Sequence, residues 1–141
     1  MAEVLARRAA DTLGIAGLDV SSAGTATGGG SPASEGAAAA ARRHGLELES
    51  HRSTPLTPPA VAEADLVLAM TPSHLARVLE LGGGGKSHLL GAYAAGGKGA
   101  SGGAAVPDPF GGSDAEYEET FTLLEALVED AMRRIASLVD T

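Results

Sequence analysis

The chain has 141 residues, the size of one domain, and its formal net charge at pH 7 is −8, which disfavours nonspecific binding to nucleic acid or to an anionic membrane. Apolar residues make up 44% of the sequence but aromatic residues only 3%, so we expect a thin, aliphatic core. The sequence has no cysteine, which excludes disulfides, thiolate zinc sites, iron–sulfur clusters and thiol nucleophiles within these 141 residues.

The first third of the chain predicts two helices with a short strand between them. Apolar residues recur at helical spacing over residues 1–14, and this opening helix lacks the apolar stretch of a secretory signal. Residues 18–24 have the pattern of a short strand that runs into a glycine-rich turn, and an alanine-rich helix is predicted from Pro32 to His44. No apolar run reaches membrane-spanning length, so we expect a cytoplasmic protein.

The middle of the chain predicts two helix starts that bracket a buried strand. Thr57 and Thr71 are each followed by proline, a combination typical of a helix cap and first turn. Between them, residues 65–70 form a continuous apolar run of strand length, which favours burial on both faces of a parallel sheet. A further strand is predicted over residues 87–91.

The last third predicts a loop and one long helix. Residues 91–106 are of low complexity, and we expect them to form a flexible surface loop. Ser113 and Glu116 have the spacing of a capping box at the start of the helix. Apolar residues then follow one another in steps of three and four, which we interpret as core packing: Tyr117, Phe121, Leu124, Val128, Ala131, Ile135 and Leu138.

The alternation of helices and strands predicts a single α/β domain over residues 1–141. We expect three layers, with helices on both faces of an open parallel sheet. The pattern begins with a helix, and no strand precedes it. In such sheets, ligands bind where the carboxyl ends of strands meet the amino ends of helices, often at the first such turn. We therefore expect the sequence to start just after that turn.

Seven segments resemble, in order and at compatible spacing, the low-molecular-weight protein tyrosine phosphatase family, which also includes arsenate reductases. The segments are MAEVLAR at 1–7, VSSAGT at 20–25, RRHGLEL at 42–48, SHRSTPLT at 50–57, ADLVLAMTPSHL at 64–75, HLLGAY at 88–93 and VPDPFGG at 106–112. The resemblance covers nearly the whole chain, and it implies the α/β fold of the phosphotyrosine phosphatase I type.

The chain departs from the family at its defining motif. The family carries a phosphate loop, C-x-x-x-x-x-R-S-P, between its first strand and first helix, and a segment like MAE follows directly. Here the chain begins at that methionine. The resemblance therefore implies that the first strand, the nucleophilic cysteine and the phosphate-clamping arginine are missing, and that the chain as given is inactive.

The resemblance assigns roles to four residues. Asp108 matches the general acid of the family, although a proline-rich turn with an incidental acid remains the alternative interpretation. Phe110 matches the aromatic residue at the pocket rim, where it would bind the substrate ring. Ser22 matches a serine whose hydroxyl supports the phosphate loop, and His51 matches a histidine beneath that loop.

The function implied by the resemblance is hydrolysis of phosphotyrosine in proteins or peptides through a cysteine phosphoenzyme, with no cofactor and no metal. The remaining histidines, His44, His74 and His88, do not have the spacing of a metal site. One hypothesis is that the record of the protein is incomplete at its start. The alternative is a non-catalytic pseudophosphatase that binds phosphate or a phosphoprotein. Arsenate reduction requires additional thiols, and the absence of cysteine argues against it.

The missing strand also predicts low stability, because in this family that strand lies in the interior of the sheet. Its neighbours would lack a hydrogen-bonding partner. We expect the chain as given to be marginally stable or to aggregate. If it folds, we expect a homodimer or a rearranged sheet to cover the gap.

Overall fold

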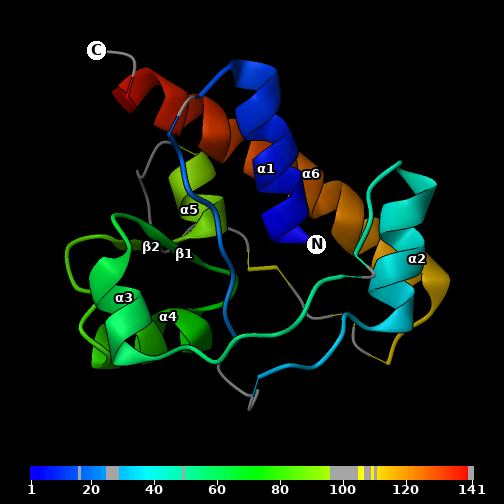
Figure 1. Ribbon diagram of the computed structural model, residues 1–141, viewed down its shortest axis with the longest axis horizontal. Helices are drawn as coiled ribbons and strands as arrows, with labels where there is room; N and C mark the ends of the chain where they lie inside the picture. Colours follow the sequence, from blue (N-terminus) through cyan, green and yellow to red (C-terminus); the bar gives the residue numbers. More distant parts are fainter. Residues whose placement is uncertain are drawn as a thin grey trace.

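The computed structural model describes residues 1–15, 17–24, 29–48, 50–95, 105–106, 109 and 111–139. Two strands and six helices follow one another along them, as Figure 1 shows: α1 (Ala2–Leu13), α2 (Glu35–Arg43), α3 (Pro58–Glu63), β1 (Val67–Ala69), α4 (Pro72–Glu80), β2 (Ser87–Leu89), α5 (Leu90–Ala94) and α6 (Asp114–Val139). The α/β class predicted from the sequence is confirmed. Within the described residues, no helix combines the length and the apolar character needed to cross a bilayer.

The sheet of the described residues consists of β1 and β2, which run parallel. Leu68 lies opposite His88 in the register, and the amide of Val67 donates to the carbonyl of Lys86 at 3.0 Å. The backbone amide and carbonyl groups of alternate residues in a strand point to the same side. Those of Val67 point toward β2, so those of its neighbours Leu66 and Leu68 point away from β2. No strand pairs with this outer edge of β1 among the described residues.

Lys86 joins this strand pair to α3. Its ammonium donates to the carbonyl oxygens of Val61 at 2.5 Å and of Ala64 at 2.6 Å, at the carboxyl end of the helix. These carbonyls have no partner within the helix itself. The side chain of Lys86 thus closes α3 while its backbone pairs with β1.

The core lies between α1 and α6, which cross in contact with each other (Figure 1). Leu5 of α1 is 2% exposed and Phe121 of α6 is 0% exposed, and both belong to one buried cluster. The predicted stripe of α6 is confirmed from Tyr117 to Ala131, whereas Leu138 is 62% exposed. The expectation of a purely aliphatic core is wrong, because all three aromatic residues of the described chain lie in this cluster: Tyr93, Tyr117 and Phe121.

Local chemistry sets three of the helix starts. The hydroxyl of Thr57 accepts a hydrogen bond from the amide of Ala60, and that of Thr71 accepts one from the amide of His74. Ser113 accepts from the amide of Glu116, while the Glu116 carboxylate accepts in return from Ser113. The two predicted Thr-Pro starts and the predicted capping box are therefore confirmed.

The structure differs from the predicted elements in three places. Residues 18–24 form an extended segment rather than a strand, with only an isolated bridge between Gly24 and Pro55. The helix predicted from Pro32 begins at Glu35, because Ser34 caps the amide of Ala37. The predicted loop 91–106 starts instead with the buried helix α5, and residues 96–104 lie outside the described part of the chain.

Candidate functional site

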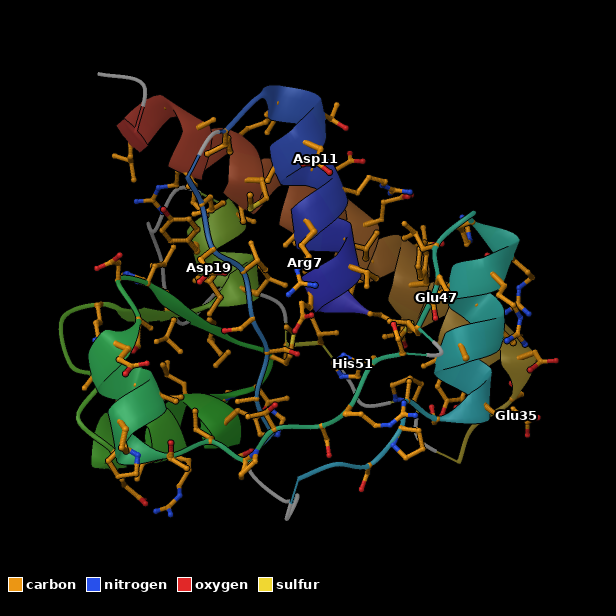
Figure 2. The ribbon with its side chains drawn as sticks, in the orientation of Figure 1. Arg7, Asp11, Asp19, Glu35, Glu47 and His51 are labelled. Carbon is orange, nitrogen blue, oxygen red and sulfur yellow. The ribbon has the colours of Figure 1, made fainter. Side chains whose placement is uncertain are left out.

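The candidate site lies at the amino end of α1, where the extended segment 18–24 meets the helix. The hydroxyl of Ser22 donates to Oε1 of Glu3 at 2.7 Å. Arg7 lies one turn further along, with Nη2 at 3.2 Å from Oε2 of Glu3, and it donates to the carbonyl of Val20 at 2.8 Å. Figure 2 shows Arg7 on the side of α1 that faces this segment. Two side chains of α1 thus hold the backbone and the hydroxyl of one extended segment.

The surroundings of these groups are partly closed to solvent. The Glu3 side chain is 14% exposed, although its partner Arg7 is 59% exposed. Burial lowers the pKa of the Met1 ammonium, while the nearby Glu3 carboxylate acts in the opposite direction. The Glu3 carboxylate is therefore held at a largely enclosed helix end, where a negative charge is favoured by the helix dipole.

His51 is brought to the same end of α1 by a buried leucine. Leu48 is 2% exposed, and Met1 and Val4 of α1 pack against its cluster. The amide of His51 donates to the carbonyl of Leu48 at 3.0 Å, and Figure 2 shows His51 on the segment that runs between the amino end of α1 and α2. His51 is half-buried at this position.

Backbone hydrogen bonds join the segment of Ser22 to the segment of His51. The amide of Gly24 donates to Thr54 at 2.8 Å, and the amide of Leu56 donates back to Gly24 at 2.9 Å. Further along, Ser53 and Gly30 continue the contact, with the Gly30 amide donating to the Ser53 carbonyl at 2.7 Å. The two predicted supporting residues, Ser22 and His51, therefore lie on segments that are tied to each other and to α1.

Asp108 and Phe110, the predicted general acid and substrate-binding aromatic residue, lie outside the described residues. Their described neighbours are Val106 and Pro109. Val106 is 4% exposed, and its amide donates to the carbonyl of Met70 at 2.8 Å. Since Met70 follows β1 directly, the chain is fixed at the carboxyl end of that strand two residues before Asp108.

Glu3 and Arg7 are the members of the site that sequence reasoning missed. Their spacing of four residues on a predicted helix, with the acid in the first turn, is a signal for an ion pair. It gives no indication of the contacts with Ser22 and Val20. Arg8, by contrast, pairs with Glu125 of α6 at 2.6 Å and so belongs to helix packing.

The chemistry available at this site follows from its groups. The guanidinium and imidazole side chains can donate hydrogen bonds, and the serine hydroxyl, whose proton is bound to Glu3, can accept them, but the 141 residues have no thiol that could attack phosphorus. Within the described ranges, no three histidine, aspartate or glutamate side chains are grouped so that they could hold a metal ion. The described groups can therefore support a phosphate site but do not supply its nucleophile.

Comparisons with known proteins give one consistent result. A family model described as "Low molecular weight phosphotyrosine protein phosphatase" matches residues 1–140. The low molecular weight protein-tyrosine-phosphatase Etp of Escherichia coli K12 is 30% identical over 122 residues, which are 85% of this chain and 78% of Etp.

Two solved structures have a similar fold. A mutant of YwlE from Bacillus subtilis is 32% identical in sequence to this chain, with a TM-score of 0.85 over 95% of this chain and 87% of YwlE. The YwlE arginine phosphatase from Geobacillus stearothermophilus is 28% identical, with a TM-score of 0.83 over 96% of this chain and 83% of that protein.

Proposed function

Since the chain belongs to the low molecular weight phosphotyrosine protein phosphatase family, we propose that the protein hydrolyses phosphotyrosine monoesters in cytoplasmic proteins or peptides. The observation that carries this proposal is the match of the family over residues 1–140. Further support comes from Ser22 and His51, whose segments lie at the amino end of α1, the kind of position where an anion is stabilised.

The proposed reaction has two steps. A cysteine thiolate attacks phosphorus, the bond from phosphorus to the phenolic oxygen breaks, and Asp108 gives its proton to the departing tyrosine oxygen. In the second step the Asp108 carboxylate takes a proton from water and the hydroxide attacks phosphorus. The bond from phosphorus to sulfur breaks, which releases phosphate and restores the cysteine thiolate. The cysteine is not among the 141 residues. In this proposal the 141 residues supply Asp108 as the acid and base, and Ser22 and His51 as residues that support the phosphate site.

The sequence of the gene tests the proposal first. Codons that precede Met1 in the same reading frame should encode a short apolar strand followed by a cysteine and, six residues later, an arginine. A stop codon or an unrelated sequence at that place would refute the assignment of the nucleophile.

The role of Asp108 is tested on the protein made from that longer reading frame. Asp108→Asn should lower kcat on a phosphotyrosine peptide by about a hundred- to ten-thousandfold, because the leaving oxygen then departs without a proton. Asp65→Asn is the matched control, because Asp65 is exposed beside β1 and should leave kcat unchanged. Equal activity of Asp108→Asn and the unmodified protein would exclude Asp108 as the acid.

Phosphoarginine is the second candidate substrate. The similarity in fold to a YwlE arginine phosphatase, with a TM-score of 0.83, favours it. The two candidates are separated by the ratio of kcat/KM on matched peptides that differ only in carrying phosphotyrosine or phosphoarginine. A ratio above one supports the tyrosine assignment, and a ratio below one supports the arginine assignment.

A non-catalytic role is the third candidate, and the absence of cysteine from the 141 residues favours it. In that case the chain would bind a phosphorylated partner without turnover. Calorimetry of the 141-residue chain with phosphate and with a phosphotyrosine peptide tests this candidate. Saturable binding without release of phosphate supports it, and the absence of any binding heat opposes it.

A further inference from the structure

Helix α2 is docked on α6 through contacts at both of its ends. At the amino end, the hydroxyl of Ser34 donates to the hydroxyl of Tyr117 at 3.1 Å. Gly36 lies directly under the ring of Tyr117, since a β-carbon at this position would lie 2.3 Å from ring carbon Cε2. Ala40 is fully buried in the middle of the contact. This end of the interface is held by shape and by a neutral hydrogen bond.

The carboxyl end of α2 is held by a charged cluster. Nε2 of His44 lies 2.5 Å from Oε1 of Glu118 on α6, and Nε of Arg43 lies 3.0 Å from Oε2 of the same carboxylate. The imidazole of His44 also stacks on the ring of Phe121, with the ring centroids 4.1 Å apart and the planes 15° from parallel. Because Phe121 is fully buried, His44 packs directly on the core.

The strength of this cluster depends on the charge of one imidazole. A protonated ring adds the attraction of a full positive charge to its hydrogen bond with the Glu118 carboxylate, and a neutral ring lacks this attraction. Protonation also places a cation at the carboxyl end of α2, next to the face of Phe121. A histidine changes its charge between about pH 5 and pH 8. Glu118 faces His44 from α6, and Arg43 of α2 binds the same carboxylate. The neighbouring Tyr117 of α6 bonds instead to Ser34 at the other end of α2.

The carboxylate stays charged over the range in which histidine titrates. The hydrogen bond from His44 lowers the pKa of Glu118, Arg43 adds to this effect, and burial opposes it. The lowered pKa keeps the Glu118 carboxylate charged to a lower pH than that of an isolated glutamate, so the cluster retains its anion as the pH falls.

The segments on either side of α2 are bonded to each other. Residues 29–34 lead into α2 and residues 46–56 lead out of it, and the two segments are joined by an antiparallel bridge between Pro32 and Arg52. The amide of Ser53 donates to Ser31 at 2.7 Å, which reinforces this contact. His51 of the candidate site lies in the second segment. His51 is thus connected to α2 both along the chain and through the segment that precedes the helix.

We propose that the contact of His44 with Glu118 and Phe121 is a pH-sensitive clamp, which holds α2 and the segment of His51 more firmly on α6 when the imidazole is protonated. The clamp works in the folded domain whether or not the phosphatase chemistry is that proposed above. Its test therefore needs no activity assay.

Hydrogen exchange of the α2 amides tests the clamp. After correction for the intrinsic exchange rates, protection of residues 37–46 in the 141-residue chain should be about two- to fivefold higher at pH 6 than at pH 8, the size expected for a partly exposed charged pair. His44→Phe keeps a ring on Phe121 but cannot be protonated, so its protection should be the same at the two pH values. Glu118→Gln should also remove the difference.

Two matched variants separate the clamp from other histidines. His88→Gln alters a histidine that contacts Tyr93 at a ring distance of 5.4 Å, and His51→Gln alters the histidine of the candidate site. Both should keep the pH difference in α2. Equal protection of the unmodified chain at the two pH values, or a difference that persists in His44→Phe, would overturn the proposal.

A second measurement covers the case in which His44→Phe does not fold. In an NMR titration of the unmodified chain, the imidazole resonance of His44 and the amides of α2 should change with one common midpoint. Midpoints that differ would show that another group controls α2, and they would overturn the proposal as well.

Discussion

Ser22 and Glu3 fix each other at the amino end of α1, since the hydroxyl of Ser22 donates its proton to Oε1 of Glu3 over 2.7 Å. A serine hydroxyl has one proton to donate and two lone pairs that accept. Because the Ser22 hydroxyl donates its one hydrogen to Glu3, it can act only as a hydrogen-bond acceptor toward other groups. It is therefore suited to receive hydrogen bonds from backbone amides near the start of α1, and not to donate one to a phosphate oxygen.

The first prediction concerns this pair. Glu3→Ala removes the acceptor of Ser22 and the partner of Arg7, so the free energy of unfolding should fall by about 1–2 kcal/mol. Urea denaturation followed by circular dichroism measures the change. Asp11→Asn on the exposed side of the same helix is the control, and it should change the free energy by less than about 0.5 kcal/mol. Equal effects of the two substitutions would contradict the role given to Glu3.

The second prediction concerns the close approach of α2 to α6. In Gly36→Ala the new β-carbon would lie 2.3 Å from the Tyr117 ring, so the helices must separate, at a cost of about 1–3 kcal/mol. Gly84→Ala is the control, because no atom lies within 4 Å of the position of its β-carbon. Thermal unfolding compares the two variants. If Tyr117→Leu relieves the effect of Gly36→Ala, the clash with the ring is its cause.

The third prediction concerns acid unfolding. The pKa of Glu118 is lowered, chiefly by the hydrogen bond from His44, so its ionised form stabilises the folded chain above the ordinary glutamate pKa of about 4.3. This contribution is lost as the pH falls from there through the lowered pKa. Between pH 5 and pH 3, the unmodified chain should therefore lose more stability than Glu118→Gln. Parallel curves of unfolding free energy against pH would contradict this sign.

Elements could be predicted where residues close together in the sequence determine them. Thr57, Thr71 and Ser113 each cap a helix with their own side chain, and each start was predicted from two or three neighbouring residues. The buried stripe of α6 could also be predicted, because apolar residues at helical spacing mark the face of the helix that contacts the core. The exposure of Leu138 could not be predicted, because it depends on which other elements pack against the end of α6.

The errors come from elements whose state depends on distant partners. Residues 18–24 have a strand-like pattern, but a strand needs a neighbour, and the contacts of this segment are with side chains of α1 and with Thr54. Helix α5 has only five residues, one of them glycine, and it is defined more by the burial of Leu90 and Tyr93 than by its intrinsic helix propensity. The family resemblance assigned Ser22 a role in supporting the phosphate loop but no position relative to α1, and its contact with Glu3 could not be foreseen from spacing alone.

The fourth prediction concerns Lys86, which donates to carbonyls at the end of α3 over 2.5 Å and 2.6 Å. Lys86→Met leaves these partly buried oxygens without the ammonium, so the unfolding free energy should decrease by about 1–3 kcal/mol. Arg77→Met is the control, because the Arg77 side chain forms an exposed ion pair with Glu80, and such pairs contribute little to stability. Hydrogen exchange should show faster opening of α3 in Lys86→Met only. Unchanged protection of α3 would contradict the capping role.

The fifth prediction concerns the outer edge of β1, which has no partner strand among the described residues. We expect the 141-residue chain to unfold over a broad temperature range and to self-associate, because an unpaired strand edge favours pairing with another chain. Sedimentation over a range of protein concentrations, together with calorimetry, measures both properties. A monomer that melts in one sharp, cooperative transition would contradict this expectation.

The bond from the Val106 amide to Met70 has a consequence for how this protein tolerates sequence change. The chain is tied to the carboxyl end of β1 at this point, whatever the number of residues in the glycine- and alanine-rich sequence at 96–104. Lengthening a connection between two fixed points costs little, about 0.6 kcal/mol for each doubling of its length. Insertions and deletions in that sequence should therefore accumulate during evolution without displacing the anchor that precedes Asp108. Proline at position 106, which would remove the amide, and polar replacements of the buried Val106 side chain should be selected against.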